Sequence, residues 1–199
     1  MEITCRVAES QEDLNKVINF RFDFLSVWNN FCVVKDTKQN TIADKFDKYA
    51  KYIICEKENN VIGVARLIPE NPDGLFMDQF INSKNYISMP SDVNQNGKFI
   101  ELSEFITHKD ERRNSRIIYM LIIYSAWYIL KSNQYNRAAS ISTRSVHELL
   151  KRLGFEKRPV EFLSEWGGVM TLHTLDFSKL NMNELERISK KLGIENFSI

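Results

Sequence analysis

Apolar positions along the chain switch between the spacing typical of strands and the spacing typical of helices. A capping box formed by Ser10 and Asp13 precedes apolar side chains at every third or fourth position, which predicts a helix that ends near Trp28. Two β-rich runs flank Asn59-Asn60, and they predict a tight hairpin because asparagine tolerates positive φ. The whole pattern predicts strands over residues 3–8, 51–58, 61–68, 98–107, 138–143 and 169–175, and helices over residues 10–28, 41–46, 75–81, 116–133, 145–153 and 176–192.

The mixture of strands and helices predicts a single α/β (α+β) domain over residues 1–199. No repeat, low-complexity tract or linker interrupts the 199 residues, and this length suits one domain with a sizeable core. Apolar residues make up 43% of the chain and aromatic residues 12%, which is ample for burial and excludes a disordered chain.

Charge and cysteine usage favour a cytoplasmic protein. The formal net charge of +1 implies no bulk attraction to nucleic acid or to an anionic membrane. Cys5, Cys32 and Cys55 are widely spaced and odd in number, which argues against a disulfide scaffold or a thiolate zinc site. The sequence begins without a signal-peptide pattern, and its longest apolar run, from Ile117 to Leu130, is too short to span a bilayer.

Two arginines stand where apolar residues are expected. Arg21 lies within the apolar stripe of the first helix and Arg66 lies inside a strand, so both need carboxylate partners if they are buried. Asp44 and Asp47 are three positions apart and would fall on one face of a short helix or turn. The four residues predict a polar network, either in a ligand pocket or as a structural salt-bridge cluster.

Several kinds of chemistry lack their usual sequence patterns. The histidines at 108, 147 and 173 show no metal-ligand spacing, so no metal site is expected. No serine or cysteine lies in a nucleophile elbow, and no phosphate-binding fingerprint is present. A transferase with this sequence would therefore act by direct attack in a ternary complex.

The order of the predicted elements, together with several motifs, resembles the GNAT acyltransferases. The run 61–67 followed by Ile100-Glu101-Leu102-Ser103-x-Phe105 is similar to the branch that contains acyl-homoserine lactone (autoinducer) synthases and N-acyl amino acid synthases. The resemblance extends over roughly residues 15–160 and includes Arg21, Phe24 and Trp28, the aspartates at 44 and 47, the strand end Ser142-Thr143, and the run 148–159.

The resemblance implies a central, mixed but mostly antiparallel twisted sheet, splayed at the active site, with helices on both faces. It implies Glu101 as the general base, because an ammonium acceptor must lose a proton before it attacks a carbonyl. Ser103 would orient the acceptor or the pantetheine, and backbone N–H groups around 104–106 would stabilise the oxyanion. The substrate-binding residues that it implies are Arg21, Trp28, Asp44, Asp47, Arg66, Phe105, Ser142 and Thr143.

The acyl donor is expected to be an acyl carrier protein carrying a phosphopantetheine thioester. CoA-dependent members of the family cradle the cofactor pyrophosphate with a glycine-rich turn, whereas residues 112–117 contain no glycine. No cofactor is expected to remain bound, and a CoA thioester is the less favoured donor. Carrier proteins are acidic, and the candidate docking residues are Arg112, Arg113, Arg116, Lys151, Arg152, Lys157 and Arg158.

Departures from the family pattern leave several functions open. Glu104 occupies the place of an arginine, and Pro69-Glu70-Asn71 replaces a proline-threonine-threonine run, which favours an amino-acid acceptor over a homoserine lactone product. The favoured product is an N-acyl amino acid, for example N-acyltyrosine. The alternatives are a homoserine lactone synthase that uses S-adenosylmethionine, an acetyl-CoA-dependent acetyltransferase, and a non-catalytic ligand-binding module.

Overall fold

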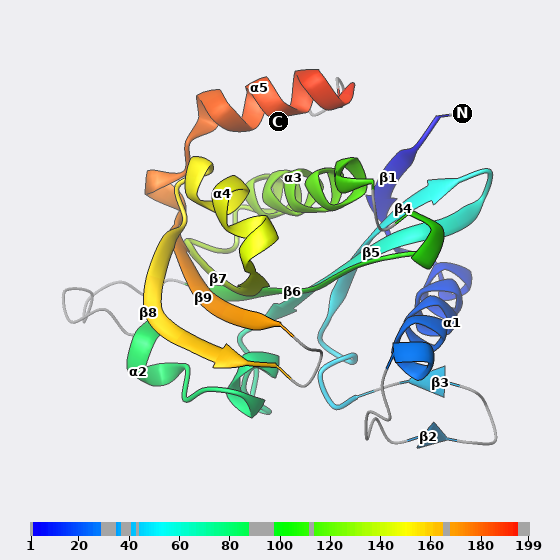
Figure 1. Ribbon diagram of the computed structural model, residues 1–199, viewed down its shortest axis with the longest axis horizontal. Helices are drawn as coiled ribbons and strands as arrows, with labels where there is room; N and C mark the ends of the chain where they lie inside the picture. The colour runs from blue at the N-terminus through cyan, green and yellow to red at the C-terminus, as the bar shows by residue number, and fades with distance from the viewer. Residues whose placement is uncertain are drawn as a thin grey trace.

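The computed structural model describes residues 2–28, 35–36, 41–42, 44–87, 98–111, 114–164 and 168–194. Strands, α-helices and 3-10 helices alternate along this part of the chain (Figure 1). In chain order the elements are β1 (Thr4–Val7), α1 (Gln11–Trp28), β2 (Lys35–Asp36), β3 (Thr41–Ile42), β4 (Lys51–Lys57), β5 (Asn60–Pro69), η1 (Phe76–Gln79), α2 (Lys84–Ile87), β6 (Phe99–Thr107), η2 (Lys109–Glu111), α3 (Ser115–Ser132), β7 (Arg137–Thr143), α4 (Arg144–Arg152), β8 (Glu156–Leu163), β9 (Val169–Asp176), η3 (Phe177–Lys179) and α5 (Met182–Leu192).

A seven-stranded sheet in the order β1-β4-β5-β6-β7-β9-β8 forms the centre of the molecule. Every neighbouring pair is antiparallel except β6 and β7, which are parallel. The pairing of β6 with β7 runs from Phe99 opposite Arg137 to Leu102 opposite Ser140, although the strands continue to Thr107 and Thr143. The sheet therefore opens beyond this point, and the expected mixed, mostly antiparallel and splayed architecture is confirmed.

Helices cover both faces of the sheet (Figure 1). The helices α3, α4 and α5 lie on one face, where the largest hydrophobic cluster joins them to the strands. The helix α1 packs on the other face against β4 and β5, and η1 and α2 pack there against the strands beyond the opening. No helix in the described part of the chain combines the length and apolar character needed to cross a membrane.

Local sequence signals account for the start of α1 and for the first hairpin. Ser10 and Asp13 form the predicted capping box, since the Asp13 backbone N–H donates to Ser10 Oγ at 3.0 Å and the Ser10 N–H donates to Asp13 Oδ2 at 3.2 Å. The hairpin turn lies one residue earlier than predicted, at Glu58 and Asn59, where φ is 53° and 64°. Two positive φ values favour the tight turn that matches the twist of the flanking strands.

The sequence pattern missed the strand β8. Pro159 lies within it, and because proline removes a donor from a strand ladder, the sequence around Pro159 does not indicate a strand. The sheet accepts this proline because β8 is at its edge, where one side of the strand has no neighbour to bond.

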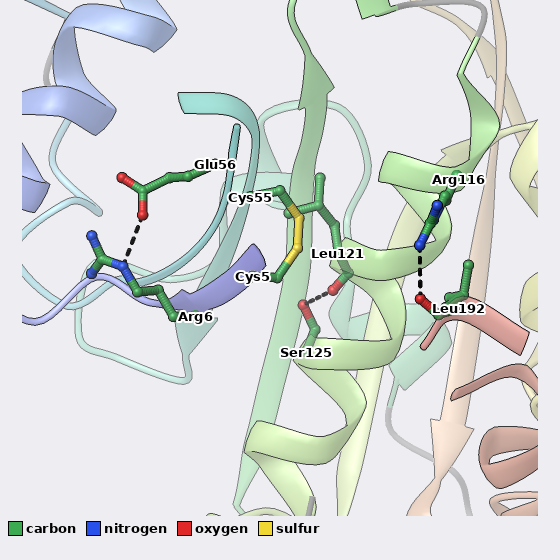
Figure 2. The surroundings of a disulfide bond; sticks show 8 residues. All are labelled: Cys5, Arg6, Cys55, Glu56, Arg116, Leu121, Ser125 and Leu192. Carbon is green, nitrogen blue, oxygen red and sulfur yellow. Dashed lines mark hydrogen bonds and ion pairs between the residues drawn. A yellow bond between two sulfur atoms is a disulfide. The ribbon is translucent and has the colours of Figure 1, made fainter. Parts of the chain in front are cut away.

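A disulfide joins the first and second strands of the sheet order (Figure 2). Cys5 on β1 lies directly opposite Cys55 on β4, with a Cα–Cα distance of 4.1 Å, and both face the core cluster beneath α3. The expectation that the cysteines form no structural disulfide was wrong. The cause is strand register, which places two residues 50 positions apart side by side and leaves no trace in cysteine spacing.

Candidate active site

Arg21 extends from α1 to the sheet and lies at the centre of an ion network. Its side chain is 1% exposed. Its Nη1 donates to both carboxylate oxygens of Asp47 at 3.0 Å and to the Tyr52 hydroxyl at 3.1 Å, and its Nε lies 2.7 Å from Glu104 Oε2. Burial opposes the charge of Arg21, but Glu104 and Asp47 outweigh burial and hold the arginine pKa above its ordinary value.

Arg66 on β5 joins the same network from the sheet and is fully buried. Its Nη1 donates to Asp44 Oδ2 at 2.6 Å and to Asp47 Oδ1 at 2.9 Å, and its Nη2 lies 2.8 Å from Glu104 Oε1. The two aspartates are positioned by their own turn, in which the Asp44 N–H donates to Asp47 Oδ2 at 2.8 Å. The predicted grouping of Arg21, Arg66, Asp44 and Asp47 is therefore present in the structure.

Glu104 is the member of the network that the sequence analysis did not assign. Its side chain is 7% exposed, and it accepts charge-assisted contacts from both guanidinium groups. Its φ of 50° is in the left-handed region, where a strand bulge forms. The register confirms the bulge, since Arg66 pairs with Ser103 and Val64 pairs with Ile106, so that two residues of β6 face one residue of β5.

The ion network carries an excess of negative charge. Two guanidinium groups meet three carboxylates, so the five groups sum to one negative charge. Burial works against ionisation of Asp47, yet the two arginines lower the pKa of this carboxyl below its usual range. An unpaired negative charge beside a cavity favours a cationic ligand such as an ammonium group.

Glu101 lies next to this network on β6 and has a different environment. Its side chain is 1% exposed, and burial raises the pKa of its carboxyl to about 8. The Met77 backbone N–H donates to Glu101 Oε2 at 3.3 Å. Among the described residues, no cationic group lies within salt-bridge distance of Glu101, so the carboxyl can exchange a proton near neutral pH.

Glu101 faces a cavity on the α1 face of the sheet that is open to solvent. Ser103 and Glu104 contribute to the polar part of its wall. The rest is mostly apolar, and three of its phenylalanines form a continuous row, in which Phe76 and Phe80 have ring centroids 5.4 Å apart and Phe80 and Phe162 stack at 5.6 Å. The lining residues are Phe76, Phe80, Glu101, Ser103, Glu104, Ile141, Phe162, Ser164 and Met170.

The remaining predicted pocket residues do not all reach this cavity. Phe105 packs against the core cluster on the opposite face of the sheet. Thr143 is exposed at the start of α4, and Ser142 is buried and contacts His173. Trp28 is the last residue of α1, and its side chain lies outside the described residues.

The predicted carrier-protein docking residues do not form one unpaired basic surface. Arg112 and Arg113 lie outside the described residues. Arg116 donates to the Leu192 carbonyl at 3.0 Å, and Lys151 is exposed on α4. The other three have acidic or hydroxyl partners: Arg152 pairs with Glu184, Lys157 with Glu161, and Arg158 with Thr174 and Glu156.

Two histidines that seemed isolated in the sequence are in contact. His147 Nδ1 on α4 lies 2.7 Å from His173 Nε2 on β9, and His173 Nδ1 lies 3.2 Å from Ser142 Oγ. No sequence signal announces this contact, because it depends on how α4 packs over β9. In the described part of the chain no group of three or more histidine, cysteine or acidic side chains is arranged to hold a metal ion.

Comparison with known proteins supplies the family context for this site. Residues 27–122 match the family model of the acetyltransferase (GNAT) domain. This part of the chain is therefore similar to the acetyltransferase (GNAT) domain. No curated protein sequence matches the chain at a significant level.

Solved structures share the GNAT fold over nearly the whole chain. The CoA-dependent acyl-homoserine lactone synthase BjaI, with SAM and isopentyl-CoA, is 18% identical, with 96% of this chain and 89% of that chain covered and a TM-score of 0.71. A second CoA-dependent synthase of this kind, MesI, is 15% identical over 98% and 97% of the two chains, with a TM-score of 0.70. FeeM, an N-acyl amino acid synthase from uncultured soil microbes, is 10% identical over 91% and 96%, with a TM-score of 0.62.

These findings confirm the resemblance to the GNAT branch. At such low identities, similarity to the solved structures shows the fold alone.

Proposed function

We propose that this protein is an N-acyltransferase that transfers a fatty acyl group from acyl carrier protein to the α-amine of an amino acid. The observation that carries the proposal is the buried carboxyl of Glu101, which faces an apolar cavity beside the opening between β6 and β7. A carboxyl with a pKa of about 8 is suited to accept a proton from an attacking ammonium or amine near neutral pH.

The acceptor amine would bind between Glu101 and the ion network. The network carries one excess negative charge, and an ammonium group would neutralise it. Its two guanidinium groups are already matched by carboxylates, so the carboxylate of an amino acid would need another partner or would exchange with Glu104. The ion network would therefore bind the amine of the acceptor, and the cavity would hold its side chain.

The bulge of β6 would supply the oxyanion site. A bulge leaves an extra residue outside the regular strand ladder, which frees a backbone donor to bind a ligand. Glu104 and the next residue form this bulge at the edge of the cavity, where the acyl carbonyl must lie if the carboxyl of Glu101 is to reach the attacking nitrogen. A backbone donor there would stabilise the negative charge that develops on the carbonyl oxygen.

The row of phenylalanines would hold the acyl chain. Phe76, Phe80 and Phe162 line the cavity together with Ile141 and Met170, and a binding site of this composition favours hydrocarbon over a polar group. An acetyl group, with a single methyl, could contact only a small part of this apolar wall. A longer chain is therefore the favoured acyl group.

The preference for acyl carrier protein rests on the sequence at the start of α3. Residues 112–116 contain no glycine, so their side chains would hinder close approach of the backbone to a pyrophosphate. A carrier-protein arm has one phosphodiester and does not need that cradle. The likeness to CoA-dependent synthases makes CoA the competing donor.

The test compares the two donors in parallel reactions. Purified protein is incubated with acyl carrier protein or CoA bearing the same long acyl chain, and with each amino acid or S-adenosylmethionine as acceptor. We expect mass spectrometry to detect an N-acyl amino acid with the carrier-protein donor, and at least about 100-fold slower formation of it with the Glu101→Gln variant. Absence of an amide with every amino acid contradicts the proposal, and a faster reaction with acyl-CoA contradicts its donor.

A second candidate function is acyl-homoserine lactone synthesis from S-adenosylmethionine. It is favoured by the likeness to BjaI, which was solved with SAM and isopentyl-CoA and covers 96% of this chain. In the same experiment a lactone formed only with S-adenosylmethionine would establish this second function instead of the first.

A further inference from the structure

A line of hydrogen-bonding side chains runs from the opened part of β7 to the protein surface. It begins at Ser142 Oγ, 3.2 Å from His173 Nδ1, and continues from His173 Nε2 to His147 Nδ1 at 2.7 Å. Ser142 is 4% exposed and His173 is fully buried, whereas His147 is partly exposed. The three side chains come from β7, β9 and α4, so packing and not sequence proximity brings them together.

The contacts fix the direction of every hydrogen bond in this line. His173 Nδ1 lies 3.1 Å from the Thr171 carbonyl oxygen, which can only accept, so Nδ1 carries the hydrogen. In a neutral imidazole the other nitrogen, Nε2, is then an acceptor. His147 Nδ1 must therefore donate to His173 Nε2.

Ser142 receives a hydrogen bond and keeps its own hydrogen available. Because His173 Nδ1–H points toward both the Thr171 carbonyl and Ser142 Oγ, the serine oxygen accepts from the ring. Among the described residues, no acceptor takes the hydroxyl hydrogen of Ser142. From the surface inward, His147 thus donates to His173 and His173 donates to Ser142. The hydroxyl hydrogen of Ser142, at the inner end of the line, has no acceptor among the described residues.

The position of Ser142 in the sheet suggests which atom its hydroxyl hydrogen would meet, namely the sulfur of a bound thioester. Ser140 is the last residue of β7 that pairs with β6, so Ser142 lies two positions into the opening. Ile141 lines the cavity on the Glu101 side, and strand alternation directs Ser142 to the α4 side. A thioester threaded through the opening would present its carbonyl to the Glu101 side and its sulfur toward Ser142.

We propose that Ser142, His173 and His147 form a proton relay that protonates the thiolate leaving group during acyl transfer. This inference rests on the proposed function and extends it to the second half of the reaction. It assigns Ser142 as the residue that contacts the sulfur, and the two histidines as positioning residues that supply its proton.

The bond changes balance without an additional reactant. The acceptor nitrogen forms a bond to the acyl carbon and gives up a proton to Glu101, while the C–S bond breaks and its electron pair stays on sulfur. The Ser142 hydroxyl proton moves to sulfur, His173 Nδ1 reprotonates Ser142, and His147 Nδ1 donates to His173 Nε2. His147 Nε2 takes a proton from solvent, and Glu101 returns one to solvent. After the thiol leaves, the reverse transfers, with water in the opening supplying a proton to Ser142 and His147 Nε2 releasing one to solvent, restore the starting tautomers.

The charged groups around the relay favour its neutral form. Burial and the nearby His147 lower the pKa of His173 to about 4, and Lys157, which is paired with His173 across β8 and β9, adds to this effect. Glu148 lies 3.9 Å from His147 Nε2 and is exposed, and Glu161 interacts with His147 from β8. At neutral pH His173 therefore remains uncharged and able to pass a proton in both directions.

The kinetic test compares a thioester whose thiolate must be protonated as it leaves with one whose thiolate leaves without a proton. Single-turnover rates are measured with two acyl thioesters of equal chain length, one of an alkyl thiol such as pantetheine and one of an aryl thiol, whose thiolate leaves without protonation. We expect Ser142→Ala to lower the rate about 100-fold with the alkyl thioester and less than about threefold with the aryl thioester. His147→Asn, which keeps a hydrogen-bond donor but cannot pass protons, should show the same preference to a smaller degree.

Ser140→Ala is the matched control, since Ser140 is a fully buried serine on the same strand and has no hydrogen-bond partner in the described part of the chain. It should leave both rates unchanged. Equal losses with the two thioesters in Ser142→Ala, or no loss with either, would overturn the relay.

A second measurement does not depend on activity. Nitrogen-15 NMR of the histidine side chains should find His173 as the Nδ1–H tautomer at pH 7, and His147 with a hydrogen on Nδ1. A His173 that carries its hydrogen on Nε2 would reverse the line and overturn the relay, even in a protein that forms the expected amide. Conversely, the expected tautomers in a protein that forms no amide would point to a failure of the proposed function alone.

Discussion

Two glutamates three positions apart on β6 have opposite surroundings. Glu104 lies between the guanidinium groups of Arg21 and Arg66. Glu101 is more deeply buried, but no cation lies within salt-bridge distance of it among the described residues, and burial raises its pKa to about 8. The bulge at Glu104 sets its carboxyl beside the two arginines, so Glu104 compensates charge whereas Glu101 can carry a proton.

Glu101→Gln should separate activity from stability. The folded protein binds the Glu101 proton more tightly than the unfolded chain, so this residue lowers stability as pH rises from its ordinary pKa toward 8. Glutamine keeps an acceptor for the Met77 N–H and cannot ionise. At pH 8 we expect the free energy of unfolding to increase by on the order of 2–4 kcal/mol, with no increase at pH 4, as measured by urea denaturation.

The same variant should lose at least about 100-fold in the rate of amide formation. The wild-type rate should rise with pH, reach half its maximum near pH 8 and level off above that, because the base acts in its ionised form. An unchanged rate in Glu101→Gln would remove Glu101 from the mechanism.

Glu104→Ala should strongly destabilise the protein. It removes the carboxylate shared by two buried guanidinium groups, and breaking a buried ion pair on one side costs about 3–5 kcal/mol. The measurement is the free energy of unfolding from chemical denaturation. The control is Glu12→Ala, which removes an exposed pair with Lys16 and should cost less than about 0.5 kcal/mol. Similar losses in the two variants would contradict a charge-compensating role for Glu104.

Among the elements, those with a local signal were predictable from the sequence. The cap of α1 formed as expected because Ser10 and Asp13 satisfy each other within one turn. The strand β8 was not predicted, because the edge position that tolerates Pro159 is a property of the whole sheet.

The same contrast applies to the candidate site. Arg21 and Arg66 stood out because a charged side chain in an apolar pattern needs partners, and the network with Asp44 and Asp47 followed from that need. The role of Glu104 depends on a bulge, and the contact of His147 with His173 depends on packing between a helix and a strand. Neither leaves a pattern in the sequence, so both required the structure.

The turn after α4 offers a test of local backbone geometry. Gly154 has a φ of 101°, and an added Cβ would lie 2.5 Å from the Lys179 carbonyl oxygen. We expect Gly154→Ala to lower the free energy of unfolding by about 2–3 kcal/mol, since left-handed strain and a backbone clash act together.

Gly193 at the end of α5 is the matched control for this turn. Its φ is 75°, but an added Cβ would meet no atom within 4 Å. Gly193→Ala should therefore cost only the left-handed strain, about 1 kcal/mol. An equal cost at both glycines would show that the close approach to Lys179 does not matter.

At the scale of the whole molecule, the Cys5–Cys55 disulfide fastens the edge strand β1 to the rest of the sheet (Figure 2). Under denaturing conditions, alkylation should modify one of the three cysteines before reduction and all three after it, as counted by mass spectrometry. Reduction should lower the free energy of unfolding by about 2–4 kcal/mol, because the bond closes a long loop in the unfolded chain. Three reactive thiols before reduction would contradict the bond.

The parallel pair β6 and β7 divides the molecule into two halves, each with its own helix cover (Figure 1). The helix α3 packs on β1, β4, β5 and β6, whereas α4 packs on β7, β8 and β9. Among the described residues, the ladder between the two strand groups runs from Phe99–Arg137 to Leu102–Ser140. On one face the two halves are joined by the hydrophobic cluster that α3, α4 and α5 share, so they do not form two independently moving bodies. A ligand that entered the opening beyond Leu102–Ser140 would therefore meet walls whose positions a common packed core fixes, and its size would be selected by a rigid gap.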